Sequence, residues 1–163
     1  MLPTDLTVSA VVENEGRFLM IEERSSGVVV VNTPGGHIES GESPETTAVR
    51  ETLEEAGCHI AVSGLLGTYL WIHPQTRQNF LRIIYTAELL AQDTTLSLDD
   101  GVHAVHWFTR ADLESRKRDI RSPVVLRAID DYLAGHRQPD SLLEGLMPVQ
   151  QNVHGVLAGA ALV

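Results

Sequence analysis

Cysteine is almost absent from this chain of 163 residues, since Cys58 is the only one. A single cysteine excludes an intramolecular disulfide framework and a cysteine-rich zinc site. Long hydrophobic runs are also missing, because no stretch reaches the roughly 18 apolar residues of a membrane-spanning helix. Residues 1–7 lack the basic region of a secretory signal peptide. We therefore expect one globular, cytoplasmic domain with its own core.

Lysine is nearly as scarce, with Lys117 alone against eleven arginines. Basic residues total 12 against 22 acidic ones, which gives a formal charge of -10. A surface this acidic repels nucleic acid backbones, so binding to a duplex is not expected. A small phosphorylated partner remains compatible, because a divalent cation can mask carboxylates locally. The arginines either bind phosphate through their planar fork or simply reflect composition.

The order of apolar residues predicts a single α+β domain with a mixed sheet covered by helices. A four-valine run at 28–31 is expected to form a buried strand. After Gly135 the pattern fades, and the apolar stretch 153–163 is too short to cross a bilayer. Periodicity predicts a hairpin of strands 6–12 and 17–22, further strands in 60–70, 80–90 and 102–108, a helical turn at 111–115 and an amphipathic helix over 123–134.

A helix is predicted over residues 44–56, because Ser43 is a good N-cap, Pro44 suits the first helical position and Gly57 is a typical C-cap. Three glutamates at i, i+3 and i+4 share one face of this helix. The other side is expected to pack on the sheet. The acidic face consists of Glu51, Glu54 and Glu55, and the expected core face of Val49, Thr52, Leu53 and Ala56.

Clustered carboxylates repel one another, at a cost of a few tenths of a kcal/mol for each like-charged i,i+4 pair. A cation that collects them removes this cost, and hard oxygen ligands suit Mg²⁺, with Mn²⁺ as a substitute. The plain alternative is a solvated acidic helix face. Spacing alone does not decide between the two.

Residues 36–58 resemble the Nudix box, G-x5-E-x7-R-E-U-x-E-E-x-G-U, in which U is a bulky apolar residue. Thr52 departs from the pattern, because the family prefers an aliphatic residue there, and a small loss of packing is expected. The resemblance implies the Nudix fold, a mixed sheet sandwiched between helices (α/β/α). The positions in register are Gly36, Glu42, Arg50, Glu51, Glu54, Glu55, Gly57 and Cys58.

The resemblance also implies the roles of the box residues. Glu51, Glu54, Glu55 and the carbonyl oxygen of Gly36 would bind the metal, with Glu54 as a ligand or as a partner of the catalytic base. Arg50 would complete the catalytic set by orienting the glutamates; the alternative is an exposed ion pair of little value. Cys58 is expected to be a small buried residue rather than a nucleophile.

Outside the box, the chain resembles the bacterial NudJ phosphatases of that superfamily over about residues 6–138. The quoted stretches are Pro34-Gly35-Gly36-His37-Ile38-Glu39, Trp71-Ile72-His73-Pro74 and Arg121-Ser122-Pro123, among others. This likeness implies release of phosphate from nucleoside tri- or diphosphates or thiamine-type pyrophosphates by a metal-activated water. The alternatives are a nucleoside triphosphate pyrophosphatase, a nucleoside diphosphate-sugar hydrolase, or a Nudix ligand sensor without catalysis.

Four residues are candidates for contact with the substrate. His37 follows the box glycines and would reach a phosphate, although a loop histidine bonded to backbone is an equal reading. Arg77 and Arg82 flank a strand near the predicted site, where exposed arginines are also common. Trp71 would stack on a ring or pack in the core. The domain is expected to span residues 1–140, with 141–163 as a packed or disordered tail, in a monomer or homodimer.

Overall fold

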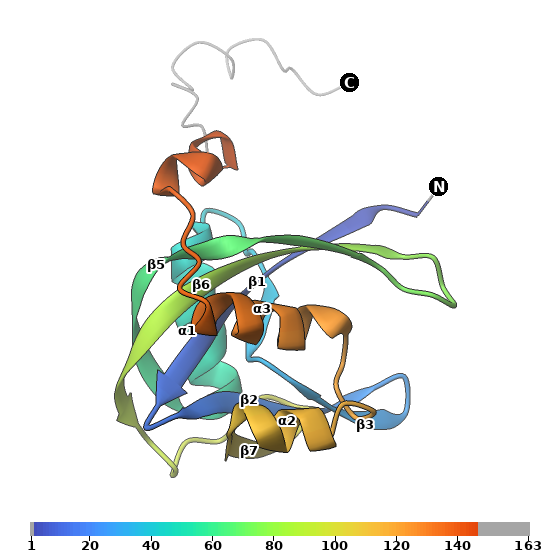
Figure 1. The fold of residues 1–163 in the computed structure, drawn as a ribbon, viewed down its shortest axis with the longest axis vertical. Coiled ribbons are helices and arrows are strands. Elements are labelled where there is room, and N and C mark those ends of the chain that lie inside the picture. Colours follow the sequence, from blue (N-terminus) through green and yellow to red (C-terminus); the bar gives the residue numbers. More distant parts are fainter. Residues whose placement is uncertain (1, 147–163) are drawn as a thin grey trace, which may run out of the picture.

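Seven strands form one mixed sheet in the computed structural model, which describes residues 2–146 (Figure 1). The central pair, β1 and β6, is parallel, and every other pairing is antiparallel. The main strand order is β3-β2-β1-β6-β5, while β4 pairs with β1 and β7 pairs with β2. The strands are β1 Thr4–Asn14, β2 Arg17–Ser25, β3 Val28–Asn32, β4 Gly35–His37, β5 Cys58–Ile72, β6 Asn79–Gln92 and β7 Val102–Phe108.

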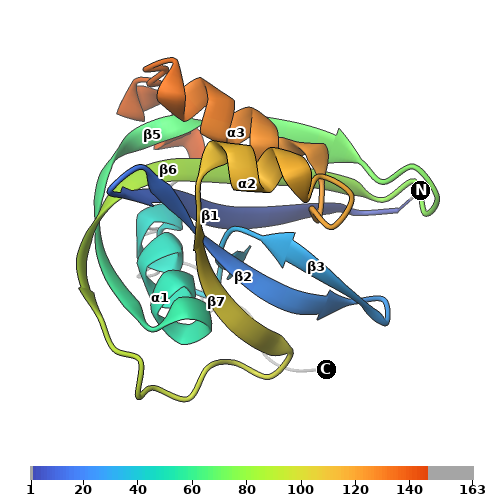
Figure 2. The same cartoon turned by 60° about the horizontal axis from the view of Figure 1, so that its bottom comes forward.

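Helices cover both faces of this sheet. Helix α1 (Pro44–Ala56) lies on one side of β1, β5 and β6, and helices α2 (Arg110–Ser115) and α3 (Pro123–Leu133) lie on the other (Figure 2). A 3-10 helix, η1 (Asp140–Leu146), follows α3. The expected α+β fold, with a mixed sheet between helices, is confirmed. No helix among residues 2–146 is long and apolar enough to span a membrane.

The two-residue period of the strands builds a separate core on each face of the sheet. On β2, Leu19 and Ile21 face the core beneath α1, whereas Phe18 and Met20 face the core beneath α3. All four side chains are at most 2% exposed. The sheet is therefore buried on both faces over this stretch, which holds it in a fixed position between α1 and α3.

The sheet opens where the two strands of the first hairpin separate, and the candidate site lies in this opening. Strands β1 and β2 pair only beside their turn, at Glu13–Phe18 and Asn14–Arg17, and then diverge (Figure 2). Beyond this point β1 pairs with β6 and β4, and β2 pairs with β3 and β7. The sheet therefore has two halves, and residues from both can line one cleft.

Helix α1 forms as its sequence signals predict. The hydroxyl of Ser43 accepts a hydrogen bond from the Thr46 amide at 3.2 Å, and Gly57 adopts a left-handed φ of 64° as C-cap. Small residues on one side, Ala48, Thr52 and Ala56, are buried against the sheet. Their small side chains allow the helix backbone to lie close to the strands. The acidic side of the helix then faces the opening between β1 and β2.

Two expectations need correction. The four-valine run is not a buried strand throughout, because β3 is an edge strand and Val28 and Val29 are 63% and 42% exposed. Val49 is 37% exposed and so lies outside the core face of α1. Within the expected tail, η1 packs Leu143 into the core at 5% exposure. The apolar stretch 153–163 lies outside the described residues.

Candidate active site

Two adjacent glycines bring a backbone segment against the acidic face of α1. Strand β4 pairs with β1 through Gly35–Ser9 and Gly36–Val8. A Cβ on Gly35 would overlap the Val8 carbonyl oxygen, and one on Gly36 would overlap the carboxylate of Glu51. Only glycine therefore permits this close approach on both sides of the segment.

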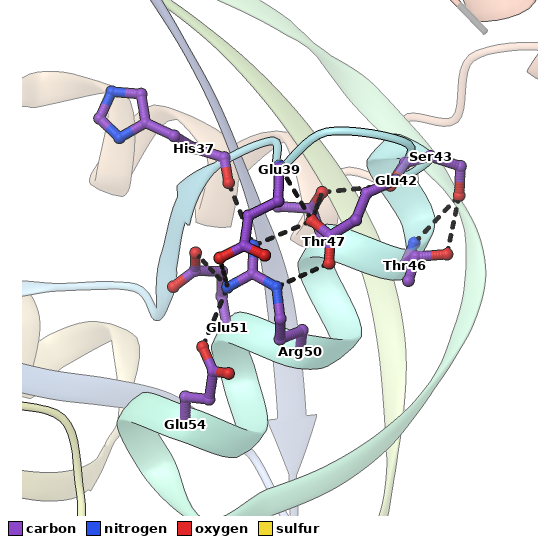
Figure 3. Close-up of polar contacts among 9 residues, drawn as sticks. All are labelled: His37, Glu39, Glu42, Ser43, Thr46, Thr47, Arg50, Glu51 and Glu54. Atoms are coloured by element: carbon purple, nitrogen blue, oxygen red, sulfur yellow. Dashed lines mark hydrogen bonds and ion pairs between the residues drawn. The ribbon is translucent and has the colours of Figure 1, made fainter. Parts of the chain in front are cut away.

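Arg50 holds three carboxylates at the edge of the site (Figure 3). Its guanidinium forms a two-pronged pair with Glu42, with Nε–Oε1 at 2.7 Å and Nη2–Oε2 at 2.9 Å. Its Nη1 donates to Glu51 at 2.8 Å and to Glu54 at 2.9 Å, and its Nη2 donates to the His37 carbonyl at 3.1 Å. These hydrogen bonds connect β4, the loop and α1 in one network, and the Arg50 side chain is only 20% exposed.

The contacts in this network shift the pKa values of its charged groups. The hydrogen bond from Arg50, more than any other interaction, lowers the pKa of Glu42 to about 2. Hydrogen bonding to Glu42 and its neighbours raises the pKa of Arg50, so this guanidinium remains charged. Burial raises the pKa of Glu51, although Arg50 opposes the shift. Arg50 and Glu42 therefore both stay charged and form a stable ion pair in the site.

Glu55 has no cationic partner within hydrogen-bonding distance among the described residues. Its Oε2 accepts a hydrogen bond from the Gly35 amide at 2.8 Å. Burial raises its pKa to about 8, and the negative charges of Glu23, Glu51 and Asp99 add to this shift. The Glu55 carboxyl group therefore lies near other acidic groups and has no hydrogen bond to a cation.

Glu51, Glu55 and the two glycines line a cleft of about 420 Å³. Two groups of residues face it. The glycine–glutamate group is Gly35, Gly36, Glu51 and Glu55, and the arginine group is Asn32, Arg82 and Arg121. The remaining lining residues include the aromatic pair Trp71 and Phe80, which stack with ring centroids 5.5 Å apart, together with Thr7, Glu23, His37, Glu39, Ser122 and Val124.

The donor chemistry of the glycine–glutamate group fits a hard divalent cation, because it offers carboxylate and carbonyl oxygens. Burial, together with the charges of neighbouring acidic groups, raises the pKa values of Glu51 and Glu55, and a bound cation would lower them. The three helix glutamates do not converge, however. Among residues 2–146 no group of three metal-binding side chains is arranged to hold an ion. Glu51 and Glu55 line the cleft, whereas Glu54 pairs with Arg50 and does not line it.

Comparison with known proteins decides the family. The family model described as NUDIX domain matches residues 3–128. Phosphatase NudJ from Escherichia coli (strain K12) is 32% identical over 139 residues, which cover 85% of this chain and 90% of that protein. NudJ from Shigella boydii gives the same values. This chain belongs to the Nudix family.

Solved structures agree with this assignment. A Nudix hydrolase from Nitrosomonas europaea superposes with a TM-score of 0.81 at 32% identity, covering 87% of this chain and 97% of that one. A MutT Nudix hydrolase from Burkholderia pseudomallei, at 21% identity, shares the fold with a TM-score of 0.67 and coverages of 79% and 98%. The expected Nudix hydrolase acting on acid anhydrides, with a small phosphorylated substrate, is therefore confirmed.

Thr52, the one departure from the Nudix box, and Cys58, its last position, are both accommodated in the core. Thr52 is fully buried, and its hydroxyl donates to the Ala48 carbonyl at 2.7 Å, so no polar atom is left unsatisfied where the family has an aliphatic residue. Cys58 is also fully buried, and burial raises its pKa to about 11. A thiol in this state is a packing residue and not a nucleophile.

Three of the four expected substrate contacts line the cleft. They are His37, Arg82 and Trp71. The His37 side chain is 71% exposed, points away from the Arg50 network and lies 3.7 Å from Asp5 (Figure 3). Arg77 does not join them, contrary to expectation, because it lies exposed in the turn between β5 and β6 with a φ of 62°.

Several cleft residues were not singled out as site residues by the sequence, and three of them bear on the charge of the cleft or hold its arginine group. Glu23 comes from β2, Asn32 ends β3 and Arg121 precedes α3. Glu23 accepts a hydrogen bond from the Asn32 amide group at 2.8 Å. Arg121 belongs to a stretch that resembles the NudJ phosphatases, which is the one signal that could have marked it. The other two become visible only when the two halves of the sheet are folded.

Proposed function

We propose that this Nudix enzyme hydrolyses a phosphoanhydride bond in a nucleoside tri- or diphosphate or a thiamine-type pyrophosphate and releases orthophosphate. The observation that carries the proposal is a single cleft that contains Glu51 and Glu55, the glycine pair Gly35-Gly36 and two arginines. The NudJ phosphatases at 32% identity support the choice of phosphate release. A cytoplasmic location and a monomer or homodimer belong to the same proposal.

Glu51, Glu55 and the Gly36 carbonyl would hold the cation, Mg²⁺ or Mn²⁺, with Glu54 joining them if it leaves Arg50. When bound, the cation neutralises charge on the diphosphate and makes a nearby water easier to deprotonate. The protein contributes position: the two glycines fix the backbone beside the carboxylates, and Arg50 sets the orientation of Glu51. A carboxylate of this group accepts the proton of the attacking water.

The remaining residues of the cleft bind and orient the substrate. Arg82 presents a guanidinium, which matches phosphate geometry. Trp71, stacked against Phe80, offers a flat face to a base or a thiazole-like ring. His37 lies at the rim, where it can contact an outer phosphate oxygen. Arg77 enters this proposal only if the hairpin that carries it moves toward the cleft.

A substrate panel with product analysis tests the function. Purified protein would be incubated with nucleoside tri- and diphosphates, nucleoside diphosphate-sugars and thiamine pyrophosphate, with Mg²⁺, with Mn²⁺ and with EDTA. We expect orthophosphate and cation dependence. Pyrophosphate plus a monophosphate would identify a triphosphate pyrophosphatase, and two monophosphates a sugar nucleotide hydrolase. Complete inactivity with both cations would favour a ligand sensor.

A further inference from the structure

Arg121 reaches the cleft because the segment before α3 is bonded to the sheet edge. The Arg121 amide donates to the Val31 carbonyl, and the Val31 amide donates to the Asp119 carbonyl, each at 2.8 Å. Ile120 and Val31 form a parallel bridge between these two bonds. The backbone that carries Arg121 is therefore held on β3, one residue from Asn32.

Arg82 points to the same place from β6, and only neutral groups accept its hydrogen bonds. Its Nη1 donates to the Asn32 side-chain oxygen at 3.0 Å, and its Nε donates to the Thr7 hydroxyl at 3.3 Å. Burial lowers the pKa of Arg82; the negative charge of Glu23 opposes this shift, and the positive charge of Arg121 adds to it. Both guanidinium-bearing residues line the same cleft.

Elsewhere in the molecule, arginines on the surface hold carboxylates directly. Arg110 pairs with Asp130 at 2.6 Å, and Arg127 pairs with Asp131 at 2.9 Å. Among the described residues, neither Arg82 nor Arg121 has an ion pair. Glu23 lines the same cleft, where its carboxylate accepts a hydrogen bond from Asn32 and acts on Arg82 only through its charge. Two guanidinium groups thus share one cleft, and neither is hydrogen-bonded to a carboxylate among the described residues.

We propose that Arg82 and Arg121 form an anion subsite for the phosphate group of the substrate that lies away from the cation. A guanidinium fork binds phosphate oxygens with two parallel hydrogen bonds, and two such forks suit a dianion. The same cleft contains the glycine–glutamate group, so one diphosphate can contact both groups. This inference rests on the proposed function and names the second anchor of its substrate.

The test uses methylenediphosphonate, a diphosphate analogue that cannot be hydrolysed, with full-length ¹⁵N-labelled protein in EDTA. The side-chain Nε–Hε signals of the arginines report contact directly, and their movement gives the dissociation constant. Arg121→Gln is compared with Arg118→Gln, which removes the same charge from an exposed position three residues earlier. Arg82→Gln tests the other arginine of the subsite. If it does not fold, Arg82→Lys, which keeps the positive charge, takes its place.

The signals of Arg82 and Arg121 are expected to move on titration, whereas that of Arg118 stays in place. Arg121→Gln should weaken binding at least about tenfold, the loss expected from one charge-assisted contact, and Arg118→Gln less than about twofold. Unmoved signals for Arg82 and Arg121, or equal binding by both glutamine variants, would overturn the subsite. Because this binding needs neither cation nor turnover, inactivity on the substrate panel would overturn the proposed function separately.

Discussion

Single residues divide the work of the site between charge and position. Arg50 contacts three glutamates and a backbone carbonyl, so its loss would release the loop and the helix together. Glu55 has a different environment, because a backbone amide is its hydrogen-bond partner and burial raises its pKa. The Glu55 carboxyl group is half-buried without a cationic hydrogen-bond partner, which is costly to the fold, and we propose that it binds a cation.

Replacing Glu55 tests that use. Glu55→Gln should lower the turnover number at least about a hundredfold, because the amide cannot supply the negative charge that holds the cation. Phosphate release under saturating substrate measures the effect, and circular dichroism checks the fold. Glu45→Gln, an exposed change on the same helix, is the matched control and should retain activity. Near-normal turnover by Glu55→Gln would remove Glu55 from the ligand set.

Glu42 predicts a pH dependence of stability. Its pKa is lowered from 4.5 to about 2 by Arg50, so the stabilisation is complete above about pH 4.5 and is lost as the pH falls toward 2. The gap in Tm between wild type and Glu42→Gln should therefore be larger at pH 6 than at pH 3. Thermal unfolding in EDTA measures both proteins.

The control for this pH series is Glu39→Gln. The Glu39 carboxylate lies 4.0 Å from the Arg50 guanidinium and is 69% exposed, so water screens the pair. Its gap in Tm from wild type should change little between pH 6 and pH 3. An equally constant gap for Glu42→Gln would show that the ion pair of Arg50 and Glu42 does not stabilise the fold.

Among the elements, α1 follows most directly from sequence. Ser43, Pro44 and Gly57 define its ends through contacts within a few residues, and the predicted bounds 44–56 match the structure. The residues of strand β3 were predicted correctly as a strand, but their burial was not. The position of β3 at a sheet edge depends on its pairing with β2. Val49 was misplaced because the face of α1 that packs on the sheet is centred on Ala48, Thr52 and Ala56, which only the packing of the helix reveals.

The N-cap of α1 predicts a measurable contribution to stability. Ser43→Ala removes the acceptor of the Thr46 amide and should reduce the free energy of unfolding by about 1 kcal/mol. Urea denaturation gives this value. Ser40→Ala makes the same change at an exposed position nearby and should be close to neutral. Equal stability of the two variants would mean that water caps the helix as well as Ser43 does.

At the scale of the whole molecule, family and fold could be predicted, but the full composition of the cleft could not. The box residues are contiguous, so Gly36, Glu51 and Glu55 were identified from spacing and resemblance. Glu23 and Arg121 come from other segments, and only the divergence of β1 from β2 and the bridge to β3 bring them in. Arg77 was expected in the cleft because it flanks a cleft-lining strand, but it does not lie there.

The boundary of the domain gives a further prediction. Leu143 packs into the core beside α1, so a chain ending at residue 140 should be less stable than one ending at 146 by about 2 kcal/mol. Urea denaturation of both chains, with Leu143→Ala in the full chain, measures this difference. Identical midpoints for the two truncated chains would show that residues 141–146 do not stabilise the domain.

The cleft draws its two groups from the chain in different ways. The glycine–glutamate group comes from one continuous stretch, residues 35–55, whereas the arginine group is collected from β3, β6 and the segment before α3. Because the proposed cation-binding carboxylates and the arginine group lie on separate segments, we expect substitutions within residues 116–122 to change substrate affinity without displacing Glu51 or Glu55.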